Sequence, residues 1–282
     1  MIAVVYSGSR HANWRLAEKG QTVSEFKTPG INPFFNDSNC ITHFLNKNIH
    51  LINNAEKIKW VYFFGAGASS EERKEIVANA LENFFRNSRV FVDHDLKAAA
   101  LATSPDKPGI LGIMGSGSNA AYFDGKKVLE NNYGLGYILG DQGSANWLGR
   151  KLLKAYLNDL LPKEFEFSFR KKYDLERTQI LDKVYRQAQP ALFLSSFSDF
   201  LIDNKNDEFV RELVINGFDI YFKTYIKPLT EKYPGVPLHM VGTVAAGFQE
   251  YLHESAENNN LKVSTILKEP IYNLLKYYSN KN

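Results

Sequence analysis

The sequence predicts an α/β protein of two domains. A hairpin pattern of strands and tight turns occurs twice, over residues 2–28 and again over residues 110–130, which indicates that one structural unit is duplicated. Apolar strands over residues 59–64 and 237–241 each run into a glycine-bearing turn and then a helix, as strands do in open α/β sheets. The 282 residues are enough for two domains with separate cores.

The composition is that of a globular protein and argues against several kinds of partner. Hydrophobic residues make up 44% and charged residues 23%, and the net charge is only +3. Charge therefore indicates neither a nucleic-acid nor a membrane partner. Cys40 is the single cysteine, so no internal disulfide can form and a reducing, cytoplasmic location is expected. The apolar run after Met1 is too short for a secretory signal, and no stretch approaches a membrane span.

Three strands separated by tight turns open the first domain. They are expected over Ile2–Tyr6, Asn13–Glu18 and Thr22–Thr28, with Ser7-Gly8-Ser9 as the first turn. Arg10 follows this turn, and its guanidinium can bind a phosphate through paired hydrogen bonds. The alternative is that Arg10 is an exposed turn residue without a role.

A rigid loop and two strand–helix pairs follow. The loop Thr28–Phe34 contains two prolines, which prevent a helix. A helix over Cys40–Ile52 is then predicted from an apolar stripe at helical spacing. The strand Lys59–Phe64 ends in a glycine-rich turn, GAGASS, and the helix Glu71–Arg86 comes next. This turn lies where open α/β folds bind ligands, but it fits a plain strand–helix connection equally well.

The strand Arg89–Val92 delivers two carboxylates and a histidine to a helix start. Asp93, His94 and Asp95 follow the strand directly, and a helix N-terminus favours carboxylates through its dipole. The simplest alternative to a functional site is that Asp93 or Asp95 caps the helix.

The second domain begins with a strand over Ile110–Met114 that breaks on the turn Gly115–Asn119, GSGSN. Shorter strands are expected over Ala121–Phe123 and Lys127–Glu130. The glycines allow the backbone to approach a ligand closely, and the serine hydroxyls and the asparagine amide can bind phosphate or sugar oxygens. A helix is expected to begin near Ser144, because apolar residues recur from there every four residues, at Leu148, Leu152, Tyr156 and Leu160.

The remainder is mostly helical up to residue 233, after which one more informative strand occurs. Amphipathic segments are expected over Arg177–Ala188, Ala191–Leu201 and Phe209–Ile226. An apolar strand then runs through His239 into Gly242 and a helix, and a last helix is expected over Ile271–Tyr278. His239 and His253 lie too far apart to suggest a local metal site, so each is expected to be a satisfied histidine.

The ordered pair of motifs over residues 115–119 and 133–149, GSGSN and YGLGYILGDQGSANWLG, resembles the second half of N-acetylhexosamine kinases. These kinases belong to the actin-like ATPase superfamily of ribonuclease H-like folds. The resemblance implies a duplicated actin-like fold with an interdomain cleft, an N-terminal domain over 1–105 and a C-terminal domain over 106–282. The last helix, about 268–282, would pack back on the first domain. A single thiol per chain excludes the iron–sulfur cluster of the dehydratase activators in the same superfamily.

The resemblance implies a kinase that uses ATP and Mg²⁺ to phosphorylate a primary hydroxyl of an N-acetylated amino sugar, N-acetylglucosamine or N-acetylmuramic acid. Asp95 matches the catalytic aspartate of the family pattern V-x-V-x-x-D-x-x-x-A and would be the general base. No protein metal ligand is implied, and a homodimer stays open. The implied nucleotide-binding residues are Ser7, Gly8, Ser9, Arg10, Ser116, Gly242, Thr243 and Ala246. The implied sugar-binding residues are Asn32, Ser118, Asn119, Gly134, Leu135, Gly136 and Asp141.

Three positions depart from the family pattern and keep other functions open. Tyr6 stands where an aspartate usually orients a metal-bound water, Arg10 follows a turn that lacks the usual phosphate-binding threonine, and Gln142 replaces a glutamate. Losing about 4 kcal/mol of metal stabilisation would slow transfer roughly a thousandfold. A non-catalytic sugar- or nucleotide-binding relative is therefore the main alternative, and an interaction protein without a ligand is the third. Asn32 also fits an ordinary Asx turn.

Overall fold

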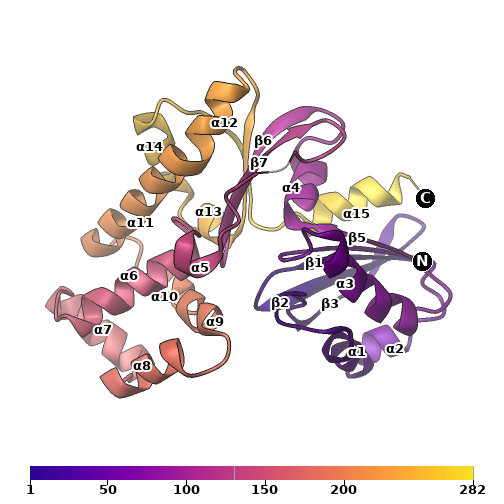
Figure 1. The fold of residues 1–282 in the computed structure, drawn as a ribbon, viewed down its shortest axis with the longest axis horizontal. Helices are drawn as coiled ribbons and strands as arrows, with labels where there is room; N and C mark the ends of the chain where they lie inside the picture. The colour runs from indigo at the N-terminus through magenta and orange to yellow at the C-terminus, as the bar shows by residue number, and fades with distance from the viewer. Residues whose placement is uncertain (130, 282) are drawn as a thin grey trace. The chain divides into compact units, whose positions relative to one another are not determined.

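The computed structural model describes residues 1–129 and 131–281, which form two compact units (Figure 1). Unit 1 consists of Met1–Lys107, Asp124–Val128 and Glu269–Asn282. Unit 2 consists of Pro108–Phe123 and Leu129–Lys268. Each unit is an α/β structure with its own sheet.

A five-stranded sheet in the order β3-β2-β1-β4-β5 organises unit 1. The first three strands are antiparallel neighbours, whereas β1, β4 and β5 run parallel. Ser7, Gly65 and His94 stand in register at the ends of the parallel strands, so these three strands finish at one edge of the sheet. The strands are β1 Ile2–Ser7, β2 His11–Glu18, β3 Gln21–Pro29, β4 Trp60–Gly65 and β5 Arg89–His94.

Helices pack against the sheet of unit 1. Alternate apolar strand residues such as Val5 and Phe63 pack with α1 and α3 in one buried cluster, as the period-two pattern of a strand requires. Tyr62 instead stacks on Tyr278 of α15 at 3.7 Å between ring centroids, and α15 also packs on α4. The helices of this unit are α1 Ser38–Asn46, α2 Ile49–Ile52, α3 Glu71–Phe84, α4 Asp95–Thr103 and α15 Ile271–Ser279.

The single helix predicted over Cys40–Ile52 is wrong, because the chain breaks into α1 and α2 at Asn48. The Asn48 side chain accepts hydrogen bonds from the backbone N–H groups of His50 and Leu51 and so starts a new helix. An asparagine competes in this way with helix propagation. Ile49 and Ile52 belong to the apolar stripe that predicted a single helix, but they are 59% and 49% exposed.

Unit 2 contains a four-stranded sheet in the order β7-β6-β8-β9. This is the order of unit 1 without β3, which confirms the predicted α/β fold class and its duplication. The third strand expected over Lys127–Glu130 is reduced to a single β-bridge at Val128, with the Leu129 N–H donating to the Tyr122 carbonyl at 2.9 Å, and Glu130 lies outside the described residues. The strands are β6 Pro108–Met114, β7 Ser118–Asp124, β8 Leu238–Val241 and β9 Val263–Leu267.

A large helical core surrounds the sheet of unit 2. The predicted helix start at Ser144 is confirmed, since its hydroxyl accepts a hydrogen bond from the Trp147 N–H. This helix ends at Leu157, so Leu160 is 69% exposed rather than buried. The helices are α5 Gly136–Leu139, α6 Ala145–Leu157, α7 Lys163–Tyr173, α8 Arg177–Tyr185, α9 Pro190–Ser195, α10 Ser198–Asp203, α11 Glu208–Tyr221, the π-helix η1 Phe222–Ile226, α12 Lys227–Lys232, α13 Thr243–Gly247 and α14 Gln249–Asn258.

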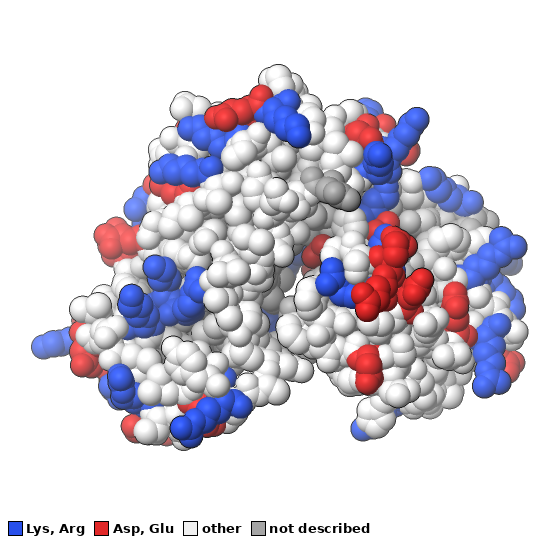
Figure 2. All heavy atoms as spheres, viewed as in Figure 1, with Lys and Arg blue, Asp and Glu red and all other residues white. Residues whose placement is uncertain are grey.

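Charged side chains of both signs are interspersed on the face drawn in Figure 2. Among residues 1–129 and 131–281, no helix combines the length and apolar character needed to cross a bilayer.

Candidate functional site

Several of the residues expected to bind nucleotide or sugar lie at the carboxyl edge of the unit 1 sheet. The turn Ser7–Arg10 follows β1, the turn Gly65–Ser70 follows β4, and Asp95 follows β5. Because the three strands are parallel and end in register, these segments meet at one edge. This is the edge at which open α/β sheets present ligand-binding loops.

The turn Ser7–Arg10 is locked to the loop that carries Asn32. The Ser7 hydroxyl accepts a hydrogen bond from the Ile31 N–H at 2.8 Å and donates to the Ile31 carbonyl at 2.9 Å. The Gly30 N–H donates to the Arg10 carbonyl at 3.1 Å. Ser7 is only 1% exposed, so its hydroxyl holds the loop, and the residues of the turn that reach the surface are Gly8, Ser9 and Arg10.

Asn32 forms the Asx turn that was the alternative to a sugar contact. Its Oδ1 accepts a hydrogen bond from the Phe34 N–H at 3.0 Å, while its own N–H donates to Asn36 Oδ1 at 2.9 Å. Gly67 has a φ of +84°, and a Cβ there would lie 2.2 Å from Asn32 Oδ1. The side-chain oxygen is thus committed to the loop, which leaves the Nδ2 group as the part of Asn32 that can contact a ligand.

Asp95 is the first residue of α4, and its carboxylate does not cap the helix. The capping group is His94, whose Nδ1 accepts a hydrogen bond from the Lys97 N–H at 3.3 Å. Asp95 Oδ1 accepts one hydrogen bond from the Leu96 N–H at 2.9 Å. Burial raises the pKa of the Asp95 carboxyl, and the neighbouring His94 partly offsets this effect. A half-buried carboxylate with a raised pKa is what a general base requires.

Asp93, the other carboxylate near this helix start, has structural partners. Its Oδ1 accepts a hydrogen bond from the His94 N–H at 2.9 Å and lies 3.5 Å from Lys74 Nζ. The ion pair with Lys74 joins β5 to α3. The surroundings of Asp93 therefore differ from those of Asp95.

Tyr6 lies in β1 close to two carboxylates. Its pKa is raised far above the ordinary range, first by burial and then by the negative charges of Asp95 and Glu269. The phenol therefore stays neutral at any physiological pH and is a hydrogen-bond donor at the place where the family pattern has an aspartate.

Glu269 was not singled out from the sequence, although a signal for it exists. It lies where the chain passes from β9 to α15, and Asp95 lies where the chain passes from β5 to α4. Since β9 holds the place in the second sheet that β5 holds in the first, Glu269 lies in the segment of the second repeat that corresponds to Asp95. Comparing the two repeats element by element would have found it.

The nucleotide-binding residues expected in unit 2 also share one edge of a sheet. Gly242 has a φ of +139°, and a Cβ there would lie 2.1 Å from the Met114 carbonyl oxygen. Only a glycine allows β8 to end so close to β6. Ser116 lies in the turn after β6, Thr243 begins α13, and the Ala246 N–H donates to the Gly242 carbonyl one turn later. The structure thus brings Ser116, Gly242 and Thr243 together.

Two of the sugar-binding residues expected in unit 2 hold the backbone of the site. Asp141, with a φ of +56°, accepts hydrogen bonds from the Ser118 N–H at 2.9 Å and from Asn146 Nδ2 at 3.1 Å. The Ser118 hydroxyl donates to the Gln142 carbonyl at 2.8 Å. Asp141 and Ser118 are 8% and 4% exposed. They join β7 to α6 and have little surface left for a ligand.

Asn119 and Gly134 lie next to each other and are more accessible. A Cβ at Gly134 would lie 3.1 Å from Asn119 Nδ2, so a larger residue at position 134 would cover this amide. Asn119 Oδ1 accepts a hydrogen bond from the Ala120 N–H at 2.8 Å. Gly136 has a φ of +75° and begins α5, and Leu135 is 55% exposed. Of the sugar-binding residues expected in unit 2, Asn119 thus keeps a partly exposed side-chain amide.

No group of three or more His, Cys, Asp or Glu side chains among residues 1–129 and 131–281 could hold a metal ion. Magnesium commonly binds through one or two carboxylates, several waters and substrate phosphates. A magnesium ion bound mainly to ATP would need only one or two protein carboxylates, and Asp95 at the unit 1 edge is one carboxylate that could serve.

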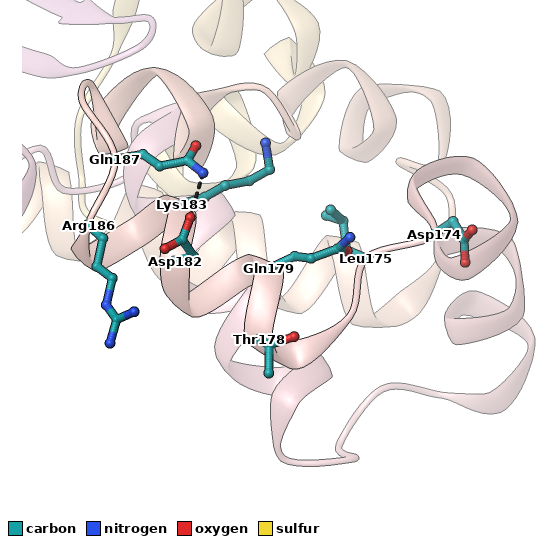
Figure 3. Close-up of a pocket in the computed structure, with 8 residues that line it drawn as sticks. All are labelled: Asp174, Leu175, Thr178, Gln179, Asp182, Lys183, Arg186 and Gln187. Carbon is teal, nitrogen blue, oxygen red and sulfur yellow. Dashed lines mark hydrogen bonds between the residues drawn. The ribbon is translucent and has the colours of Figure 1, made fainter.

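A hollow of about 600 Å³ lies along α8 in unit 2, away from all of these residues in the sequence (Figure 3). Two of its lining residues are hydrogen-bonded, since Asp182 accepts from Gln187 Nε2 at 2.6 Å. The lining mixes acidic, basic and amide side chains from α8 and its flanks, so the hollow has no single chemical preference. Its lining residues are Asp174, Leu175, Thr178, Gln179, Asp182, Lys183, Arg186 and Gln187.

Comparison with known proteins finds structural relatives over the whole chain. A protein from Porphyromonas gingivalis, provisionally assigned as an N-acetylglucosamine kinase, is 34% identical and has a TM-score of 0.92, with 99% of each chain covered. A protein from Chromobacterium violaceum with the same provisional assignment is 13% identical, with a TM-score of 0.70 over 98% of this chain and 99% of that chain.

A ROK-family glucokinase from Streptomyces griseus, solved with glucose and AMPPNP, has the same fold. It is 14% identical and has a TM-score of 0.61 over 98% of this chain and 97% of that chain. No protein-family model and no curated protein sequence matches the chain.

Proposed function

Since the chain belongs to the N-acetylglucosamine kinase-like sugar kinases of the actin-like ATPase superfamily, we propose that it phosphorylates an N-acetylated amino sugar with ATP. The proposed substrates are N-acetylglucosamine and N-acetylmuramic acid, and the acceptor is a primary hydroxyl. The whole-chain likeness to the Porphyromonas gingivalis protein supports the sugar class.

The observation that carries the proposal is the position of Asp95. Its carboxylate is half-buried at the first residue of a helix, is not used as a cap, and has a raised pKa because of burial. In the proposed reaction the sugar hydroxyl oxygen attacks the γ-phosphorus while its proton passes to Asp95. The bond from that phosphorus to the bridging oxygen breaks, and ADP leaves with the electron pair.

The other residues of the site bind and orient the two substrates. Backbone N–H groups and the Arg10 guanidinium of the first turn are proposed to contact the phosphates, together with the Ser116 hydroxyl. The Gly242–Ala246 segment is proposed to lie against the adenosine. The amides of Asn32 and Asn119 are proposed to donate to sugar hydroxyls, because neither Nδ2 group donates to a described residue. Magnesium bound with ATP would neutralise phosphate charge.

A second candidate function, sugar or nucleotide binding without transfer, is favoured by the surroundings of Tyr6. A neutral phenol replaces a carboxylate there, and the adjacent Ser7 hydroxyl is occupied by Ile31. The first turn therefore has no carboxylate at position 6 to hold a metal-bound water, and its Ser7 hydroxyl is not available to bind a phosphate. This candidate shares the ligands of the kinase but not its reaction.

Two measurements on one preparation separate these candidates. Isothermal titration measures the binding of each amino sugar, and a coupled assay with ATP and magnesium measures ADP release. The kinase proposal expects both binding and turnover. Binding without turnover would contradict it and leave the binding function.

The variant Asp95→Asn tests the base, and Asp93→Asn is its matched control. Asparagine at position 95 can still accept the hydrogen bond from the Leu96 N–H, so sugar affinity should be kept while kcat falls about 10²- to 10⁴-fold. Asp93→Asn changes a carboxylate two residues away that binds Lys74, and kcat should stay within about threefold. Equal activity of the two variants would overturn the assignment of Asp95.

A further inference from the structure

Two tyrosines buried beneath the proposed sugar-binding residues of unit 2 have no counterpart in the motifs described so far. Tyr221 ends α11, and Tyr225 lies in the π-helix η1 that follows it. They are 0% and 2% exposed, and their rings meet edge to face at 5.1 Å between centroids. The widened turn is closed by the Lys227 N–H, which donates to the Phe222 carbonyl. Such π-turns inside helices are frequent at functional sites.

Tyr221 supports Asn119 directly. Its hydroxyl donates to the Asn119 carbonyl at 2.9 Å, although the two residues are 102 positions apart in the sequence. Gly112 in the middle of β6 makes this reach possible, because a Cβ at that position would lie 2.6 Å from the Tyr221 hydroxyl. Gly112 therefore leaves room for two buried groups: the Tyr221 hydroxyl, which holds the backbone of Asn119, and Met240 Sδ, which would lie 2.4 Å from a Cβ at this position.

Tyr225 supports the exposed segment that follows Asn119 in the sugar site. Its ring stacks on Tyr133 at 4.9 Å between centroids, and its hydroxyl lies 3.1 Å from the position that a Cβ of Gly140 would occupy. Between these two points Ile138 and Leu139 are exposed by 66% and 74%. Tyr225 thus contacts the segment at both ends.

Arg150 supplies one further anchor for the same segment. Its guanidinium donates to the Tyr137 carbonyl at 3.0 Å. This contact lies at the start of α5, between the two contacts of Tyr225, and it comes from α6 rather than from the π-helix. The segment is therefore held from two independent elements.

We infer that Tyr221 and Tyr225 are positioning residues that raise the affinity of the site for sugar by holding Asn119 and residues 133–140 in place. The affinity for ATP does not depend on them. The inference rests on the proposed function, because Asn119 and residues 133–140 are its sugar-binding elements. Neither tyrosine contacts Ser116 or the Gly242–Ala246 segment in any of the interactions described, so nucleotide affinity does not depend on them. If the Asn119 amide were free to move, sugar binding would have to order it, and this loss of conformational freedom would weaken the affinity for sugar.

The test uses Tyr221→Phe, Tyr225→Leu and a control that loses the same kind of bond elsewhere in unit 2. Tyr156→Phe removes a hydroxyl of a buried tyrosine that donates to the Leu175 carbonyl at 3.1 Å, so it matches Tyr221→Phe in chemistry. Steady-state kinetics give KM for sugar and for ATP. Hydrogen exchange of the ligand-free proteins reports on residues 118–120 and 133–140.

The inference expects KM for sugar to rise about tenfold in Tyr221→Phe and Tyr225→Leu, with KM for ATP within twofold of wild type. Exchange should quicken in residues 118–120 for Tyr221→Phe and in residues 133–140 for Tyr225→Leu. Tyr156→Phe should leave both KM values and both segments unchanged. If Tyr221→Phe matches Tyr156→Phe in exchange and in KM for sugar, the inference is wrong.

The exchange measurement separates this inference from the proposed function. If the wild-type protein phosphorylates no amino sugar, the proposed function fails, but exchange in the ligand-free protein still decides whether the tyrosines order the two segments. Should Tyr225→Leu not fold, Tyr221→Phe alone decides, because it removes a single oxygen atom and keeps the ring.

Discussion

The lock between the first turn and the Asn32 loop predicts a large effect of Gly30→Ala. A Cβ at Gly30 would lie 2.5 Å from the carbonyl oxygens of Gly8 and Ser9. An ordinary contact begins at 3.4 Å, so the loop and the turn must separate by about 0.9 Å. That movement strains the hydrogen bonds that Ser7 makes to Ile31, and overpacking of this kind costs about 1–3 kcal/mol.

The expected result is a lower Tm together with weaker binding of both substrates. A loss of about 1–3 kcal/mol lowers Tm by about 2–4 °C for each kcal/mol in a chain of this size. Because the turn carries the proposed phosphate contacts and the loop carries Asn32, KM should rise for ATP and for sugar in the same variant. Thermal unfolding and two-substrate kinetics measure these effects.

Gly8→Ala is the matched control for stability. A Cβ at Gly8 would meet only the His11 carbonyl oxygen, at an ordinary 3.8 Å, and its Tm should stay within about 1 °C of wild type. If Gly30→Ala has the Tm of Gly8→Ala and unchanged KM values for both substrates, the turn and the loop are not coupled and the reasoning fails.

Three further predictions concern individual residues. Gly242→Ala should lower the free energy of unfolding by about 3 kcal/mol or more, because φ is +139° and a Cβ would lie 2.1 Å from the Met114 carbonyl oxygen. Gly115 has open space around it, so Gly115→Ala should unfold like wild type in the same denaturant titration. Burial raises the pKa of Asp95, so the wild-type protein loses stability as the pH rises through that pKa. The Tm of Asp95→Asn should therefore exceed that of wild type at pH 7, and the difference should disappear in acid. An equal Tm at pH 7 would count against burial of the charge. Tyr6→Asp should strengthen magnesium-dependent nucleotide binding in a calorimetric titration, and no change would mean that the metal is held elsewhere.

The fold could be predicted from the sequence because its signals are local. Apolar runs that end in glycine-rich turns predicted the strands whose carboxyl ends carry the candidate binding residues. Ser144 predicted the start of α6. The errors also have local causes. Asn48 divides a helix whose apolar spacing looked continuous. The third strand of the first repeat is reduced in the second repeat to a single β-bridge at Val128.

The roles of single side chains were harder to predict, because they depend on partners far away in the sequence. Ser7 was expected to bind phosphate, but its hydroxyl bonds Ile31, 24 residues later. Ser118 and Asp141 were expected to bind sugar, yet the Asp141 carboxylate accepts a hydrogen bond from the backbone N–H of Ser118, 23 residues earlier. The Ser118 hydroxyl in turn donates to the Gln142 carbonyl. The support of Asn119 by Tyr221 spans 102 residues. The spacing of residues along a single sequence does not predict contacts between side chains that are so far apart in the chain.

The most direct test of the account is the product of a reaction with ATP, magnesium and N-acetylglucosamine or N-acetylmuramic acid, analysed by mass spectrometry and ³¹P NMR. The account predicts a sugar monophosphate esterified at the primary hydroxyl with the wild-type protein and with Asp93→Asn, and none with Asp95→Asn. No sugar phosphate from the wild-type protein, or an unchanged yield from Asp95→Asn, would contradict it.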